Sequence, residues 1–274
     1  MQLSINIITV LFLIAAYSGS GQDIRKTAAE FVATLDEHQK AKAIYPYTDD
    51  ERFNWSFVPR TRNGLPLEAM DPRQRAAAMA LLKASMSDQG YTKISGILAL
   101  EAILRQLEGR DETDDYRNPQ KYYFTIFGEP SFEEPWVWRI EGHHLSLNFS
   151  SIKGLIESST PSFMGANPAK VLRGPDTGKQ VLQQESDLGF LLVNSFSDEQ
   201  LKAVVFSPSA LPEIITGNDR KARSLEPQGL SYTEMNENQR RTLMRLLDVY
   251  VRNYQLGFSR KLMDKIVRSG IENL

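Results

Sequence analysis

A repeated segment constrains this chain more than any other feature of its sequence. Residues 64–87 read GLPLEAMDPRQRAAAMALLKASMS, and residues 229–252 read GLSYTEMNENQRRTLMRLLDVYVR. At a constant offset of 165, eight of the nineteen positions in 64–82 carry the same residue in both copies. Gln39 and Gln200 lie in a weaker, preceding match at an offset of 161. Such self-similarity predicts a structural unit that is used twice.

The repeated unit is predicted to be helical. Asp71 followed by Pro72 is typical of an N-cap and a first helical position, and Asn236 is the corresponding cap in the second copy. Apolar residues then recur at helical spacing. We expect a first helix over about 23–43 that recurs at about 197–206, and a further helix over about 92–108 that follows the first copy.

Between the copies the sequence predicts strands. KYYFTIFG (121–128) is aromatic and β-branched, and WVWRIEGHHLSLNFS (136–150) alternates in character. A turn at Glu141–Gly142 is expected to place Arg139 opposite His144, with one face of the hairpin apolar and the other polar. The chain is therefore assigned to the α+β class. Paired helices are repeated on either side of a central antiparallel hairpin or sheet, as a pseudo-symmetric internal duplication.

The N-terminus has the pattern of a signal peptide. Residues 5–16 read INIITVLFLIAA, which is uncharged but too short to span a bilayer. Small residues follow, so cleavage is expected near Gly19–Gly21, with residues 1–21 as the signal peptide. The product is expected to be periplasmic or extracellular and not bound to a membrane. Residues 22–274 are assigned to one domain, with helical repeats over about 23–108 and 188–270 around a sheet over about 118–173.

Composition excludes several functions. The 274 residues include 32 Lys plus Arg and 34 Asp plus Glu, a formal net charge of −2, and no cysteine. A nucleic-acid-binding domain normally has a basic excess, so nucleic acid is not an expected partner. Catalysis by a cysteine nucleophile is excluded. The expected partner is instead a small molecule, for example a carbohydrate-like ligand.

The polar face of the hairpin supplies the candidate catalytic residues. His144 shares that face with Arg139 and Asn148 in the expected register, whereas His143 points to the opposite face. These types suit proton transfer by histidine, binding of an anion by arginine and orientation by asparagine. His144 with Glu141 is a weak candidate for a divalent metal site, because no established metal-ligand spacing is present.

A second candidate site lies in the segment DDERFNWSFVPRTRNG (49–64). Arg52, Trp55, Arg60 and Arg62 in this loop form a set suited to a sugar or a carboxylate ligand. The alternative is a structural loop that packs Trp55 on the core.

Several motifs together resemble the family of proteins of unknown function numbered 3500. They are ERFNW, LLKASMSDQGY, WVWRIEGHHLSLNFS and PSFMGANPA, with GHHLSLN as the most specific, and the resemblance covers about residues 27–270. The resemblance implies an exported bacterial type of protein without an assigned activity. It also implies a second aromatic strand pair and a further histidine motif after the last helix, so the chain is expected to be C-terminally truncated relative to the family.

Two classes of function follow from these observations. The first is an exported hydrolase with metal assistance that uses the His-containing sheet face. The second is a non-catalytic exported ligand-binding protein that uses Trp55 and the arginines, or a truncated inactive paralogue. The sequence leaves the choice between enzyme and binding protein open.

Overall fold

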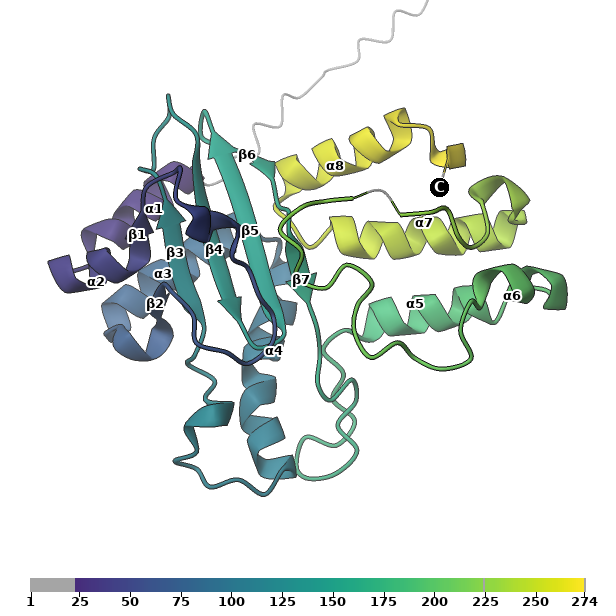
Figure 1. Ribbon diagram of the computed structural model, residues 1–274, viewed down its shortest axis with the longest axis horizontal. Helices are drawn as coiled ribbons and strands as arrows, with labels where there is room; N and C mark the ends of the chain where they lie inside the picture. The colour runs from purple at the N-terminus through teal and green to yellow at the C-terminus, as the bar shows by residue number, and fades with distance from the viewer. Residues whose placement is uncertain (1–22, 224, 274) are drawn as a thin grey trace, which may run out of the picture.

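The computed structural model describes residues 23–223 and 225–273 and shows an α+β fold (Figure 1). A mixed sheet of seven strands contains β1 (Ile44–Tyr45), β2 (Leu65–Pro66), β3 (Tyr123–Phe127), β4 (Trp136–Gly142), β5 (Leu145–Ile152), β6 (Leu155–Ser158) and β7 (Ser162–Met164). The main strand order is β1-β3-β4-β5-β6, while β2 pairs with β3 and β7 with β5. All of these pairs are antiparallel except β1 with β3.

Helices surround the sheet on the two sides that Figure 1 shows. The N-terminal group is α1 (Ile24–Ala33), α2 (Glu37–Ala43), α3 (Pro72–Ser85) and α4 (Asp88–Leu107). The C-terminal group is α5 (Gln183–Val193), α6 (Asp198–Val204), α7 (Glu237–Val251) and α8 (Leu256–Arg268). Short 3₁₀ helices lie at η1 (Asp50–Phe53), η2 (Leu67–Ala69), η3 (Asp115–Arg117), η4 (Tyr232–Glu234) and η5 (Ile271–Asn273).

The single helix expected over 23–43 is wrong, because the chain forms two helices there. Asp36 caps α2 by accepting from the backbone N–H of Gln39, and the Gln39 side chain accepts from the N–H of Asp36. This reciprocal capping box starts a new helix within three residues of the end of α1. The caps predicted at Asp71, with Pro72 in the first turn, and at Asn236 are confirmed.

The core lies between one face of the sheet and the N-terminal helices. Phe31 of α1 packs on Phe124 of β3, and Trp138 of β4 stacks on Phe149 of β5 with ring centroids 4.6 Å apart. Each of these four side chains is at most 1% exposed. The alternating sequence predicts which face of each strand is apolar. Burial of that face determines which side of the sheet packs against the helices.

The predicted hairpin is present, but its predicted turn is wrong. The two-residue turn is His143–His144, after the last pair Gly142↔Leu145, and Arg139 lies opposite Asn148. The turn lies two residues later than expected and the partner of each β4 residue four residues later, so each residue that stays in a strand keeps its predicted face. The His144 backbone has φ 57°, in the left-handed region that non-glycine residues seldom adopt.

Candidate functional site

The tip of the β4–β5 hairpin brings the two histidines together at one end of the sheet. Because both residues lie in the turn, their rings do not point to opposite faces of a strand, and the ring centroids are 4.0 Å apart. The backbone N–H of His144 donates to the carbonyl of Phe57 at 2.7 Å, which ties the tip to the loop before β2. The turn thus presents the imidazoles at the junction of several segments.

His143 is paired with a buried carboxylate from helix α4. Its Nδ1 contacts Oε1 of Glu101, whose side chain is 6% exposed. The other contact to this ring, from Arg117 at 3.3 Å, also involves Nδ1, so Nε2 has no hydrogen-bond partner among the described residues. A carboxylate on Nδ1 selects the tautomer with the proton on Nδ1 and makes Nε2 the basic nitrogen.

Arg117 of η3 is held behind this pair. Its guanidinium lies 4.0 Å from Glu101 Oε2 and donates to Glu108 Oε1 at 2.7 Å. Those hydrogen bonds lower the pKa of the Glu108 carboxyl to about 2, so Glu108 is ionised over the physiological range. The ionised Glu108 carboxylate therefore holds the Arg117 guanidinium in place beside Glu101 and His143.

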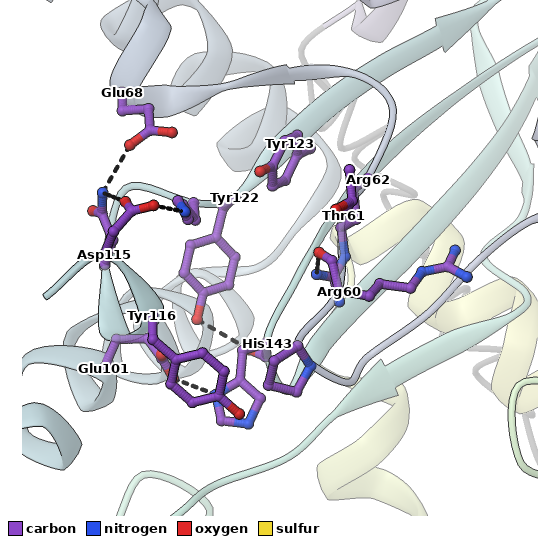
Figure 2. Close-up of a pocket in the computed structure, with 13 residues that line it drawn as sticks. Arg60, Thr61, Arg62, Glu68, Glu101, Asp115, Tyr116, Tyr122, Tyr123 and His143 are labelled. Atoms are coloured by element: carbon purple, nitrogen blue, oxygen red, sulfur yellow. Dashed lines mark hydrogen bonds and ion pairs between the residues drawn. The ribbon is translucent and has the colours of Figure 1, made fainter. Parts of the chain in front are cut away.

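A cleft of about 420 Å³ opens beside His143 (Figure 2). Tyr122, at the start of β3, donates from its hydroxyl to the backbone carbonyl of His143 at 3.0 Å. Its ring passes over Gly142, where a Cβ would come within 2.3 Å of a ring carbon, so only glycine fits at this position. The other lining residues include Pro59, Arg60, Thr61, Arg62, Glu68, Asp115, Tyr116, Asn118, Lys121 and Tyr123.

Two arginines of the loop before β2 give the cleft its positive charge. Arg62 donates to the carbonyl of Gly142 at 3.1 Å, and Arg60 donates to the carbonyl and the side-chain oxygen of Asn54 at 3.0 and 2.9 Å. Neither guanidinium forms an ion pair with a carboxylate among the described residues. Lys121, by contrast, is paired with Asp115. Both arginines therefore bring positive charge to the cleft that no carboxylate pairs, although Arg62 also donates to the carbonyls of Ser56, Val58 and Arg60.

His144 faces a different environment from the one expected. It lines a hollow with Phe57, Val58 and Phe163, rather than the strand face of Arg139. Burial lowers its pKa to about 4, with further contributions from the nearby charges of His143 and Arg117. His144 is consequently neutral near pH 7.

The other predicted catalytic residues lie beneath the loop that precedes β2. Arg139 is 0% exposed, and its guanidinium lies 2.7 Å from Glu51 and 3.3 Å from Glu141. Glu141 also accepts from the N–H of Ser56 at 2.9 Å, and burial raises the pKa of its carboxyl. Asn148 donates to the carbonyl of Pro161 at 2.9 Å. Arg139 and Glu141 fasten the loop to the sheet, whereas Asn148 bonds to the segment between β6 and β7. Glu141 is bound to Arg139 and Ser56 rather than grouped with His144.

The structure divides the predicted ligand-binding set in two. Arg60 and Arg62 line the cleft at His143, while Arg52 and Trp55 line a separate hollow of about 550 Å³. Trp55 is 6% exposed and donates from its indole N–H to the carbonyl of Asp219 at 3.0 Å. Its packing matches the structural alternative for this residue.

Sequence reasoning missed Glu101 and Tyr122. Glu101 interrupts the apolar stripe of α4, where Ile97 and Leu104 are buried on the same side. A carboxylate within an apolar helix face is rarely buried unless it is paired, and this was the available signal. Tyr122 lay within the aromatic run already assigned to the sheet.

Two features are absent from the part of the chain that the structure describes. Within residues 23–223 and 225–273, no three His, Asp or Glu side chains are grouped so as to hold a metal ion. Over the same ranges, no helix combines the length and the apolar character that crossing a bilayer requires.

Comparison with protein families gives a match over nearly the whole chain. The family described as protein of unknown function (DUF3500) matches residues 18–274. Comparisons with curated proteins and with solved structures give no match.

Proposed function

The chain belongs to the DUF3500 family, and because that family has no assigned function, we propose one from the cleft itself. We propose that the protein is an exported hydrolase for a small anionic substrate, with His143 as the general base. The observation that carries this proposal is the buried Glu101 carboxylate on Nδ1 of a histidine that lines a cleft with Arg60 and Arg62, neither of which has a carboxylate partner among the described residues.

The proposed roles follow from the contacts of each group. His143 accepts a proton from water at Nε2, and Glu101 stabilises the imidazolium that results, as a carboxylate does in hydrolytic triads. Arg60 and Arg62 bind the anionic part of the substrate and hold it against the base. Tyr122 holds the histidine backbone and acts as a positioning residue.

Export is proposed from the N-terminal sequence. The uncharged run at 5–16 and the small residues near Gly19–Gly21 lie outside the described residues. Helix α1 begins at Ile24 with Asp23 as its N-cap, directly after the predicted cleavage region. A cleaved product would therefore keep every element of the fold described above.

The enzymatic proposal is tested with chromogenic esters that carry a negative charge. The purified chain is assayed against p-nitrophenyl phosphate, p-nitrophenyl sulfate and mono-p-nitrophenyl succinate, and any activity is compared with that of His143→Gln. Loss of a general base should lower kcat about 10²–10⁴-fold. His38→Gln is the matched control, because His38 is exposed on α2 and lies outside the cleft.

The substrate-binding role is tested separately. Arg60→Gln should raise KM with a smaller effect on kcat, because the arginine binds substrate and transition state alike. Activity that is unchanged in His143→Gln contradicts the catalytic assignment. Saturable binding of succinate or phosphate that depends on Arg60 and Arg62, without turnover of any ester, would instead identify a ligand-binding protein.

A further inference from the structure

A hollow of about 550 Å³ lies on the mostly polar face of the sheet and shares no residue with the proposed catalytic cleft. The β4–β5 hairpin forms its floor, where Val137 of β4 is paired with Ser150 of β5 and Asn148 lies two residues before Ser150. The loop before β2 and segment 214–223 form its walls. We call this space the Asn148 hollow and define it by its floor residues together with Arg52, Phe163 and Lys221.

Segment 214–223 is fastened to the loop before β2. The Trp55 indole N–H donates to the carbonyl of Asp219 at 3.0 Å, and the Asn218 amide donates to the carbonyl of Trp55 at 3.3 Å. The guanidinium of Arg220 lies 3.1 Å from Asp50 Oδ1. These contacts join two segments that are far apart in the sequence, so the walls of the hollow are in place before a ligand binds.

Asn148 places an unsatisfied acceptor at the floor of the hollow. The residue is 4% exposed, and its Nδ2 donates to the carbonyl of Pro161 at 2.9 Å. Because only the NH₂ group of an amide can donate to a carbonyl, this bond fixes which way the amide points. Oδ1 is buried and has no hydrogen-bond partner among the described residues. A bound O–H or N–H group would remove the free-energy cost of this unpaired acceptor.

Arg52 places positive charge at the same hollow. Its guanidinium carbon lies 4.3 Å from the ring centroid of Tyr47 and 4.6 Å from that of Phe53. Its Nε is buried without a hydrogen-bond partner, and no carboxylate in the described part of the chain pairs with the guanidinium. The two rings therefore hold the guanidinium while its N–H groups can still bind an anion.

Segment 214–223 adds one further positive charge that no carboxylate pairs. Arg220 is paired with Asp50, and Arg223 is paired with Asp219. Lys221 also lines the hollow and forms no ion pair with any described residue. The hollow therefore has an excess of positive charge that attracts an anion.

The rest of the lining is largely apolar. Phe163 of β7 stacks on Phe57 with ring centroids 4.0 Å apart, which holds its ring at the side of the hollow. Val137 and Ile214 line the same space. Such a surface suits the apolar body of a small molecule, with a few polar groups to orient it.

We propose that the Asn148 hollow binds a small organic acid that carries an apolar body and a hydroxyl or amide N–H group. The carboxylate of the ligand binds Arg52 and Lys221, its hydroxyl or N–H donates to Asn148 Oδ1, and its apolar body packs on Phe163. A neutral sugar would leave the charge of Arg52 unpaired and offer little apolar surface. The proposal does not depend on hydrolysis at His143, because the two sites have no residue in common.

The test uses phenyllactate, which combines a carboxylate, a hydroxyl and a phenyl ring. Its binding to the full chain is measured by isothermal titration calorimetry at low ionic strength, where charge is least screened. Arg52→Gln should weaken binding about tenfold or more, because charge-assisted hydrogen bonds are lost. Arg60→Gln is the matched control: it removes an arginine of the same loop that lines the other cleft, and it should leave this binding unchanged.

NMR locates the bound acid within the chain. Of the three tryptophans, only Trp55 lines the hollow, while Trp136 and Trp138 are 0% exposed in the core. The indole N–H resonance of Trp55 should therefore shift as phenyllactate is added, and the other two should shift much less.

The acceptor role of Asn148 is tested by changing the ligand, so that the fold of the chain is not perturbed. Hydrocinnamate is phenyllactate without the hydroxyl, and it should bind about tenfold more weakly because Asn148 Oδ1 stays unpaired. Phenylpropanediol has no carboxylate and should bind still more weakly, because it leaves the positive charge of Arg52 without a partner.

Three results would overturn the proposal. The first is the absence of saturable phenyllactate binding in the millimolar range. The second is equal affinity for hydrocinnamate, which would show that no donor reaches Asn148. The third is binding that depends on Arg60 rather than on Arg52, which would place the acid in the cleft at His143.

Discussion

Helices α1–α3 and helices α5–α7 share a hydrogen-bond frame but differ in what covers them. The paired glutamines (Gln39 with Gln74, Gln200 with Gln239), the capping boxes and the positive φ of Gly64 and Gly229 occur in both sets. Only the N-terminal set is covered by the sheet. Local side-chain hydrogen bonds therefore define the geometry of such a helix pair, whereas burial of its apolar side chains depends on the sheet.

The candidate chemistry lies with the covered set. The chain has three histidines, all before residue 145, and the cleft is formed by α4, η3, the loop before β2 and the hairpin turn. The C-terminal set contributes no residue to this cleft. Substitutions at equivalent positions of the two sets can therefore be compared by their effect on the free energy of unfolding. The difference gives the part of the stability that depends on the sheet.

The largest difference is expected for the aromatic contact to the sheet. Phe31→Ala removes a 0% exposed ring that packs on Phe124, and it should lower the free energy of unfolding by about 3–5 kcal/mol. Leu192→Ala, at the equivalent position of α5, removes a smaller and less enclosed side chain and should cost about 1–2 kcal/mol. Urea denaturation of both variants provides the measurement. Equal losses would show that the sheet adds nothing to burial at this position.

The two glycines separate backbone strain from contact with the strand. Gly64→Ala and Gly229→Ala both impose a side chain at φ near +104°, which should cost about 1–2 kcal/mol each. Only Gly64→Ala also drives a Cβ toward Thr125 and the carbonyl of Phe124, so its total loss should reach about 3 kcal/mol. The measurement is the midpoint of thermal or urea unfolding.

The paired glutamines should behave alike in both sets. Gln74→Ala and Gln239→Ala each remove the side-chain half of a capping box and three further side-chain hydrogen bonds, at sites that are 7% and 1% exposed. Each should cost about 2 kcal/mol, since the groups left behind lose their partners. Urea unfolding is again suitable, with the exposed Gln183→Ala as a control. A large loss at Gln74 alone would show that the frame depends on the sheet after all.

Sequence reasoning identified the elements better than their junctions. The apolar and polar faces of the hairpin were predicted correctly, whereas the turn was placed two residues too early. Moving the turn by two residues shifts the strand pairing by four and leaves each strand residue on its face, so the alternation could not distinguish the two registers. The decisive contacts are the Tyr122 ring over Gly142 and the left-handed backbone of His144, and both depend on the folded chain.

The candidate site was predicted only in part for the same reason. Arg60, Arg62 and His143 were selected by type, and the structure places all three at one cleft. Glu101 comes from a helix about forty residues earlier, and the sequence gives no distance between that helix and the turn. Arg139 and Asn148 were predicted on one face correctly, but the loop that buries them could not be placed on that face from the sequence.

A further difference should be a pH dependence confined to the covered set. The pKa of His144 is about 4 in the folded chain against an ordinary value near 6.5, because burial disfavours its charged form. Between these values the unfolded chain binds more protons, so stability should fall as pH decreases from about 6.5 to about 4 and then stop changing on account of this group.

His144→Asn removes this titration while an asparagine tolerates the φ of 57°. The variant should therefore flatten the stability profile between about pH 6.5 and 4. NMR titration of the His144 ring in the folded chain gives the direct measurement, with an expected midpoint of about 4. A midpoint near the ordinary value would mean that the hollow beside Phe57 and Phe163 admits water. In that case the turn would be as open to solvent as the uncovered helices are, and the contrast between the two sets would not extend to the site.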